Sequence, residues 1–84
     1  MHEIKLLPRA TKDLDKFPRD IFNRIKIEIK NLCDNPRPFG CVKLTAEDGY
    51  RIRVGDYRIL YRIDDQSKII FVYRIRHRKD AYRE

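Results

Sequence analysis

The sequence predicts one α+β domain over residues 1–84, in which an N-terminal strand and an αα-hairpin precede an antiparallel-rich sheet, with the helices packed on one face. Two periodicities carry this prediction. Between Pro8 and Leu32, apolar residues recur every three or four positions, as on an amphipathic helix. Between Val42 and Arg76, apolar and polar residues alternate, as on strands that bury one face.

The N-terminal part divides into one strand and two helices. Residues 3–7 alternate weakly and are expected to form the opening strand. The first helix begins at Pro8, because a missing N–H costs no hydrogen bond in the first turn. Pro18 ends this helix and can start the second, which closes at residues 34–36. The apolar positions that set the helical spacing are Ala10, Leu14, Phe17, Ile21, Ile25, Ile29 and Leu32.

Four runs rich in Ile, Val, Tyr and Phe are expected to form strands: residues 42–44, 50–54, 57–63 and 68–76. A tight turn at residues 55–56 pairs Arg53 with Arg58 across the first long hairpin. Residues 64–67 make the next turn. Alternation along the last strand predicts that Arg74 and Arg76 point outward, beside Ile70 and Val72. The same alternation predicts that the intervening residues point toward the helices, namely Ile69, Phe71, Tyr73 and Ile75.

Charge is concentrated in the C-terminal part of the chain. The net charge is +7, with ten basic and eight acidic residues in 1–48 and ten basic and five acidic residues in 49–84. A basic half favours a polyanionic partner, such as nucleic acid, an anionic membrane surface or an acidic protein. The basic residues lie on strands and not on an amphipathic helix, which disfavours a membrane role. Without a visible signal peptide or an apolar run of about 18 residues, a soluble cytoplasmic protein is expected.

The two cysteines, Cys33 and Cys41, allow a disulfide or two reduced thiols, and a cytosolic protein favours the thiols. Their spacing fits no zinc motif, and only His2 and His77 could add imidazole ligands. We therefore expect neither a metal nor another cofactor.

One face of the predicted sheet is lined with arginine. Arg51 and Arg53 share a face, and the turn brings Arg58 and Arg62 to the same side. A solvated polar face is the simplest interpretation, but such a face would mix signs, and the only acidic residue between 50 and 63 is Asp56 in the turn. Guanidinium groups match phosphate oxygens in bidentate geometry. The pattern therefore predicts phosphate binding.

The C-terminal tail follows the last strand and can fold back over the arginine face. His77 is an imidazole that could move a proton, although it could equally be a surface histidine bonded to the backbone. Tyr82 could exchange a proton or stack on a base, and the alternative is a tail residue that packs against the sheet edge.

Three blocks of the sequence together resemble the RelE branch of the RelE/ParE toxin superfamily: residues 43–44, 49–61 and 77–82. The resemblance covers nearly the whole chain. It implies the toxin of a type II toxin–antitoxin pair, an endoribonuclease (mRNA interferase) that cuts mRNA without a metal, typically on the ribosome. It also implies a RelB-like antitoxin as a protein partner, beside mRNA and the ribosome.

The predicted site residues come from two sources. The resemblance implies roles for Arg51, Arg53, Arg58, Arg76 and Tyr82, and the residue pattern described above adds the others. Catalytic roles are expected for Arg58, Arg76, His77 and Tyr82. RNA binding is expected for Lys43, Arg51, Arg53, Arg62, Arg74 and Arg78, and Arg78 is the alternative to Arg76. Arg51 and Arg53 stand where the best-known member has lysines. Because a guanidinium stays protonated, we expect them to act through charge and not as proton acceptors.

Two other functions remain open. A ParE-like toxin would share the fold and inhibit DNA gyrase through protein contact, without needing Arg58 and Tyr82 together. A non-catalytic module would bind RNA or ribosomes and cleave nothing.

Overall fold

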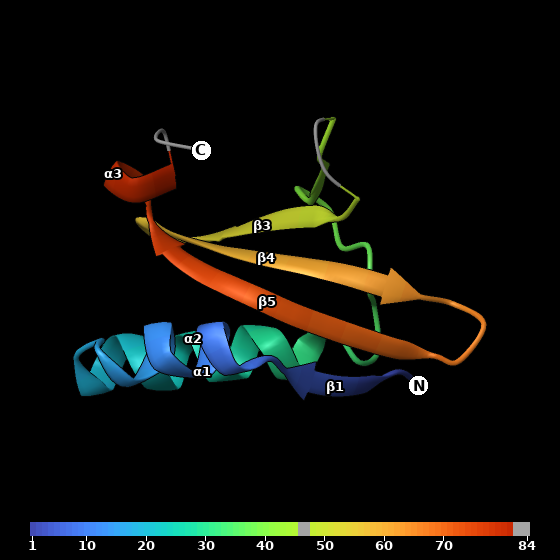
Figure 1. The fold of residues 1–84 in the computed structure, drawn as a ribbon, viewed down its shortest axis with the longest axis horizontal. Coiled ribbons are helices and arrows are strands. Elements are labelled where there is room, and N and C mark those ends of the chain that lie inside the picture. The colour runs from blue at the N-terminus through green and yellow to red at the C-terminus, as the bar shows by residue number, and fades with distance from the viewer. Residues whose placement is uncertain (46–47, 82–84) are drawn as a thin grey trace.

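The computed structural model describes residues 1–45 and 48–81. Its elements follow in the order β1 (Glu3–Leu6), α1 (Pro8–Asp15), α2 (Arg19–Asn31), β2 (Val42–Lys43), β3 (Tyr50–Val54), β4 (Tyr57–Asp64), β5 (Ile69–His77) and α3 (Arg78–Ala81). The five strands form one sheet in the order β1-β5-β4-β3-β2. Only the β1–β5 pair is parallel. The expected α+β architecture is confirmed (Figure 1).

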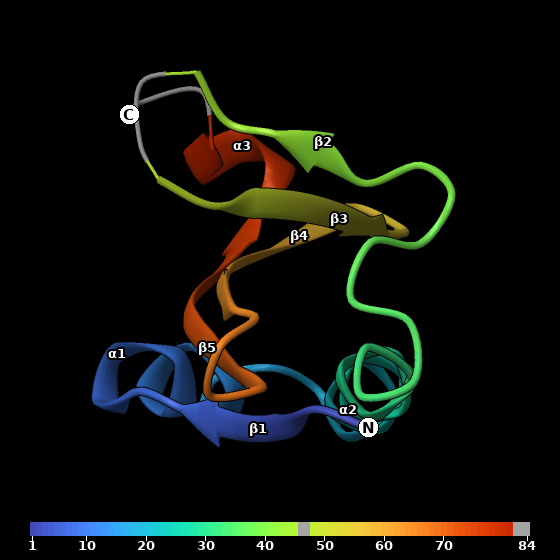
Figure 2. The same cartoon turned by 90° about the vertical axis from the view of Figure 1, so that its right-hand side faces the viewer.

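The helices α1 and α2 lie on one side of the sheet, and the short helix α3 lies on the other (Figures 1 and 2). Each long helix buries the apolar stripe that its spacing predicts. Ala10 and Leu14 are buried from α1, and Ile25 and Ile29 are buried from α2. The strands complete the core with Ile52, Val54, Ile59, Tyr61, Ile70, Val72 and Ile75.

One expectation about β5 is wrong, and a β-bulge is the reason. Leu60 is the cross-strand partner of Arg74, but the next residue, Tyr61, is the partner of Val72, so Tyr73 is an extra residue in β5. An extra residue reverses the alternation on one side of it. Arg74 keeps its expected outward direction, but Val72 does not share its face. The buried residues of β5 are Ile70, Val72 and Ile75, in place of the predicted Ile69, Phe71, Tyr73 and Ile75.

The loop between α2 and β2 is held at its middle by three side chains. The Tyr61 hydroxyl donates to the Pro36 carbonyl at 2.8 Å, and burial raises the pKa of this phenol. Arg37 Nη2 lies 2.8 Å from Asp65 Oδ2, and Arg37 Nε donates to the Tyr50 hydroxyl at 3.1 Å. The loop is therefore fixed to both β4 and the β4–β5 turn.

Cys33 and Cys41, at either end of this loop, are free thiols and form no disulfide.

Among residues 1–45 and 48–81, no helix combines the length and apolar character that a membrane crossing requires.

The bulge makes a testable prediction about two adjacent isoleucines. Ile70 is fully buried, whereas Ile69 is partly exposed. Ile70→Ala leaves a cavity in the core and is expected to lower the unfolding free energy by about 2–5 kcal/mol. Ile69→Ala should lower it by much less. Urea denaturation of both variants measures this, and equal losses would contradict the bulged register.

The Arg37–Asp65 pair predicts a pH effect on stability. The hydrogen bond that Arg37 donates to Asp65 holds the pKa of this carboxyl group below its usual value. A carboxylate with a lowered folded-state pKa contributes stability above about pH 4 and loses it as the pH falls through the folded pKa. Asp65→Asn should therefore be less stable than the unmodified protein at neutral pH, and the gap should close in acid. Urea denaturation along a pH series tests this, and a constant gap would exclude the charge effect.

Candidate functional site

Three arginines from neighbouring strands form one row across the sheet. Arg53 in β3 is the cross-strand partner of Arg58 in β4, and Arg58 is the partner of Arg76 in β5. Cross-strand partners point to the same face of a sheet. The adjacent row, which contains Ile59 and Ile75, is buried in the core on the opposite face. The predicted pairing of Arg53 with Arg58 is therefore confirmed, and Arg76 extends it.

This row brings like charges together at the centre of the sheet. Each such cross-strand pair is unfavourable by tenths of a kcal/mol up to about 1 kcal/mol. Arg58 is only 8% exposed and is the one buried charged side chain in the part of the chain described. Guanidinium groups bind phosphate oxygens through charge-assisted, bidentate hydrogen bonds. The arrangement is thus suited to binding an anion.

A hollow of about 250 Å³ opens beside this row. Arg51, Arg53 and Arg58 line it, together with Gly40 and Val42. Val42 belongs to the hollow because it is the cross-strand partner of Arg51 and so faces the same side. We call these five residues the arginine hollow.

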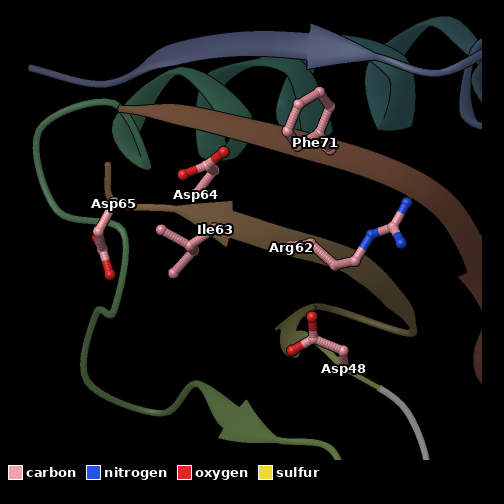
Figure 3. Close-up of a pocket in the computed structure, with 6 residues that line it drawn as sticks. All are labelled: Asp48, Arg62, Ile63, Asp64, Asp65 and Phe71. Carbon is pink, nitrogen blue, oxygen red and sulfur yellow. The ribbon is translucent and has the colours of Figure 1, made fainter. Parts of the chain in front are cut away.

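The other end of β4 carries the opposite charge. A second hollow, of about 460 Å³, is bordered by the carboxylates of Asp48, Asp64 and Asp65 (Figure 3). Hydrogen bonds from the backbone N–H groups of Ser67 and Gln66 lower the pKa of Asp64, so this end stays negatively charged. Asp64 lies six positions along the strand from Arg58, a distance of roughly 20 Å. An anionic ligand is therefore directed to the arginine end.

The acidic end does not form a metal cluster. Within the residues that the structure describes, no three His, Cys, Asp or Glu side chains are grouped to hold a metal ion. Arg62 lines this acidic hollow, and its guanidinium lies 5.4 Å from the centre of the Tyr73 ring. The structure therefore places Arg62 away from the arginine hollow.

Arg74 is held by a carboxylate of α1. Asp13 Oδ2 accepts from Arg74 Nε at 2.8 Å and from the Ile75 backbone N–H at 3.0 Å, and Asp13 Oδ1 accepts from Arg74 Nη2 at 3.2 Å. Both side chains are largely buried, at 23% and 15% exposed. The Ile75 N–H lies beyond the end of β1, where α1 takes over the edge of β5. The Asp13–Arg74 pair thus joins helix to sheet.

His77 lies on the helix side of the sheet. It is the cross-strand partner of Tyr57, and the two rings meet edge to face at 5.1 Å. Tyr57 in turn packs on Phe17 at 4.7 Å. His77 Nδ1 accepts from the Lys79 backbone N–H at 3.2 Å, so this nitrogen carries no proton in that bond. The structure does not bring His77 together with Arg58.

The remaining predicted residues divide between the two faces. Lys43 is the partner of Tyr50, which directs it to the side opposite Arg51. Arg78 is exposed on α3, and its backbone N–H donates to the Asp56 carbonyl at 2.7 Å. This bond ties the start of α3 to the β3–β4 turn, next to the arginine row. Tyr82 lies outside the described residues.

Sequence reasoning missed Asp13, Gly40 and Val42. Asp13 is 61 residues from Arg74 in the sequence, and no local sequence pattern predicts a contact between residues so far apart. Gly40 lies in a loop between the predicted helix and strand, where no periodicity marks it as part of a site. Val42 was recognised as a strand residue, and its place beside Arg51 follows only from the pairing of β2 with β3.

Comparison with known proteins places these features in a wider group. A family model described as the ParE toxin of the type II toxin–antitoxin system, parDE, matches residues 4–82. The chain is 30% identical over 84 residues to toxin RelG of Mycobacterium tuberculosis, covering 98% of this chain and 97% of that protein. It is 39% identical over 77 residues to toxin RelE3 of Methanocaldococcus jannaschii, covering 84% of each. Its fold is similar to that in the toxin–antitoxin complex RelBE2 from Mycobacterium tuberculosis, with a TM-score of 0.82, 28% identity, and 90% and 96% of the two chains covered.

The contrast between Arg74 and Arg53 predicts different effects on stability. Arg74→Gln leaves the partly buried Asp13 carboxylate without its charged partner and is expected to lower the unfolding free energy by about 1–3 kcal/mol. Arg53→Gln removes one of three clustered charges and should leave stability unchanged or slightly raised. Urea denaturation at neutral pH compares them. A larger loss for Arg53→Gln would contradict the role given to Asp13.

Proposed function

The chain belongs to the ParE toxin family of type II toxin–antitoxin systems, with relatives in the RelE branch, and from this we propose that it is a metal-independent endoribonuclease that cleaves mRNA on the translating ribosome in the cytoplasm. One observation carries the proposal. Arg58 is buried at the centre of a row of three arginines. It also lines the arginine hollow, to which the same face of the sheet contributes Arg51 and Val42. RNA offers a phosphate at every nucleotide, and arginine side chains are common phosphate ligands.

The reaction suits a site that supplies charge and alignment. The RNA 2′-OH attacks the adjacent phosphorus, a new 2′-O–P bond forms, and the P–O5′ bond breaks. The phosphate gains charge in the transition state, and fixed guanidinium groups stabilise that charge. Arg58 is suited to this role because it is held in the sheet and shielded from water. Arg53 and Arg76, on either side, hold the phosphate from the neighbouring strands.

Two proton transfers complete the reaction. One proton leaves the 2′-OH, and the departing 5′-oxygen takes one up. We assign a proton transfer to Tyr82, which follows α3 in sequence. The alternative, His77, faces Tyr57 on the opposite side of the sheet, which favours Tyr82. Alignment of the 2′-OH with the scissile bond is left to contacts along the mRNA backbone.

The other basic residues near the site would bind flanking phosphates. Arg51 lines the arginine hollow, and Arg78 lies on α3 at the end of the arginine row. Their contribution would be electrostatic and sensitive to salt concentration. Lys43, Arg62 and Arg74 face other surroundings, so we give them no direct part in holding the cleaved phosphate.

A RelB-like antitoxin is the proposed protein partner. The similar solved structure is a toxin–antitoxin complex. An acidic segment that folds on binding would complement the net charge of +7 on this chain. By covering the arginine hollow it would exclude RNA.

A second candidate is inhibition of DNA gyrase, because the matching family model carries the ParE name. This activity would depend on protein contact and would not require the buried arginine. The two candidates therefore differ in what the loss of Arg58 should do.

Replacement of Arg58 should separate chemistry from binding. Arg58→Ala is expected to lower the single-turnover cleavage rate by about 100-fold or more, because it removes charge stabilisation from the transition state. RNA affinity should fall by less than about tenfold, since other arginines still bind the backbone. Equal losses in both quantities would mean that Arg58 only binds RNA. Arg9→Ala, an exposed arginine on α1, is the matched control and should change neither.

The activity itself is tested in a reconstituted translation system, with cleavage sites mapped by primer extension. Discrete cuts should appear with the unmodified protein and vanish with the Arg58→Ala, Tyr82→Phe double variant. If translation continues uncut while gyrase supercoiling is inhibited by both proteins, the gyrase function replaces the ribonuclease one.

A further inference from the structure

Phe39 is the most exposed large apolar side chain in residues 1–45 and 48–81, with 105% of its reference accessibility. A single exposed apolar residue is common on protein surfaces. Its surroundings therefore decide whether it has a role. Phe39 lies in the loop that runs from α2 to β2 along the side of the sheet (Figure 2).

A tight turn holds Phe39 at its tip. The Cys41 backbone N–H donates to the Pro38 carbonyl at 3.0 Å, which closes a four-residue turn. Gly40 has a φ of 92°, the left-handed value that a type II turn requires at its third position. Phe39 then takes the second position, whose side chain points away from the turn. The aromatic ring is thus displayed by a defined backbone.

The rest of the loop is anchored on the side that precedes this turn. Tyr61 bonds to the Pro36 carbonyl, and Arg37 pairs with Asp65, as described above. Strand β2 begins at Val42, directly after the turn. With both flanks fixed to the sheet, little conformational entropy remains to be lost when a ligand contacts Phe39.

The turn borders the arginine hollow. Gly40, the residue after Phe39, is one of the residues that line it, and Val42 is another. Val42 is 43% exposed, so the rim on this side is apolar. Arg51, Arg53 and Arg58 form the rest of the lining. The turn that displays the exposed Phe39 ring therefore borders a cationic hollow.

We propose that Phe39 is a stacking platform for the base of a nucleotide whose phosphate is held by the arginine hollow. This inference rests on the proposed ribonuclease function and names a residue that positions its substrate. Single-stranded RNA is bound by other proteins through this combination of a cationic groove and aromatic rings on which bases stack. Stacking would fix the nucleotide beside the cleaved bond and would favour bases with large ring faces.

The surroundings of Phe39 favour a nucleotide as the occupant. Among the residues that the structure describes, the lining of the hollow beside Phe39 includes three arginines and no carboxylate, while Asp48, Asp64 and Asp65 line the hollow at the other end of β4. A ligand that contacts Phe39 therefore lies beside the positive charges of the arginine hollow, and a negatively charged group on the ligand would bind there. Nucleotides carry a base and a phosphate in one unit, so they satisfy both requirements.

The sequence provides a direct optical test, because the chain contains no tryptophan. Phe39→Trp introduces a single indole at the tip of the turn, and base stacking quenches indole fluorescence. The probe is a short 2′-O-methyl RNA oligonucleotide, which has no free 2′-OH and is not cleaved. We expect strong quenching with this oligonucleotide and little with an otherwise identical abasic one. Equal quenching by both would overturn the stacking role.

Affinity measurements provide the second test. Phe39→Ala is expected to weaken binding of the 2′-O-methyl oligonucleotide by about tenfold. Phe39→Tyr should restore binding and Phe39→Leu should not, because only the former keeps an aromatic face. Ile27→Ala removes another exposed apolar side chain, on α2, and should leave affinity unchanged. A loss of less than twofold for Phe39→Ala would overturn the inference.

The outcomes separate this inference from the ribonuclease function. If the unmodified protein cleaves mRNA but Phe39→Trp is not quenched, the stacking role fails and the ribonuclease function stands. If Phe39→Trp is quenched only by the base-bearing oligonucleotide and no mRNA is cleaved, Phe39 binds bases and the ribonuclease function fails. If Phe39→Ala binds RNA normally but loses affinity for the protein antitoxin, the residue contacts protein and the stacking role is wrong.

Discussion

The pairing of β4 with β5 is the contact on which the rest of the structure depends. It sets Ile59 against Ile75 in the core and, one residue away, Arg58 against Arg76 on the other face. The same strand pair carries the bulge at Tyr73, which lets both ends of β5 bury an apolar row. Without that extra residue, one end of the strand would turn its arginines into the core or its isoleucines into water.

The two faces of the sheet therefore contribute to stability in opposite ways. Its helix-covered face gains stability by removing apolar area from water. Its other face accumulates like charges, which oppose folding. At the edge of β5, the Asp13 carboxylate offsets the positive charge of Arg74 and also accepts a hydrogen bond from the Ile75 N–H. Arg58, with Arg51 and Arg53, lines the arginine hollow, which opens to the surface.

The loop between α2 and β2 is held by a residue of the core and by a residue of the β4–β5 turn. Tyr61 is a core residue, yet its hydroxyl reaches out to hold the Pro36 carbonyl. Arg37 extends the same anchor to Asp65 at the acidic end. A loop fixed in this way can carry Phe39 to the rim of the hollow without losing its position. Core packing thereby sets the place of a surface residue.

Several features were determined by the sequence alone because they depend on neighbours along the chain. Helical spacing, the proline positions and the Gly55-Asp56 turn predicted the helices, the strands and the pairing of Arg53 with Arg58. Other features were decided only by the tertiary structure. The alternation of apolar and polar residues does not reveal the bulge at Tyr73, and the Asp13–Arg74 pair joins residues that are 61 positions apart. Such features arise when whole elements pack, because register and long-range ion pairs are chosen by the fit of the core and not by local preference.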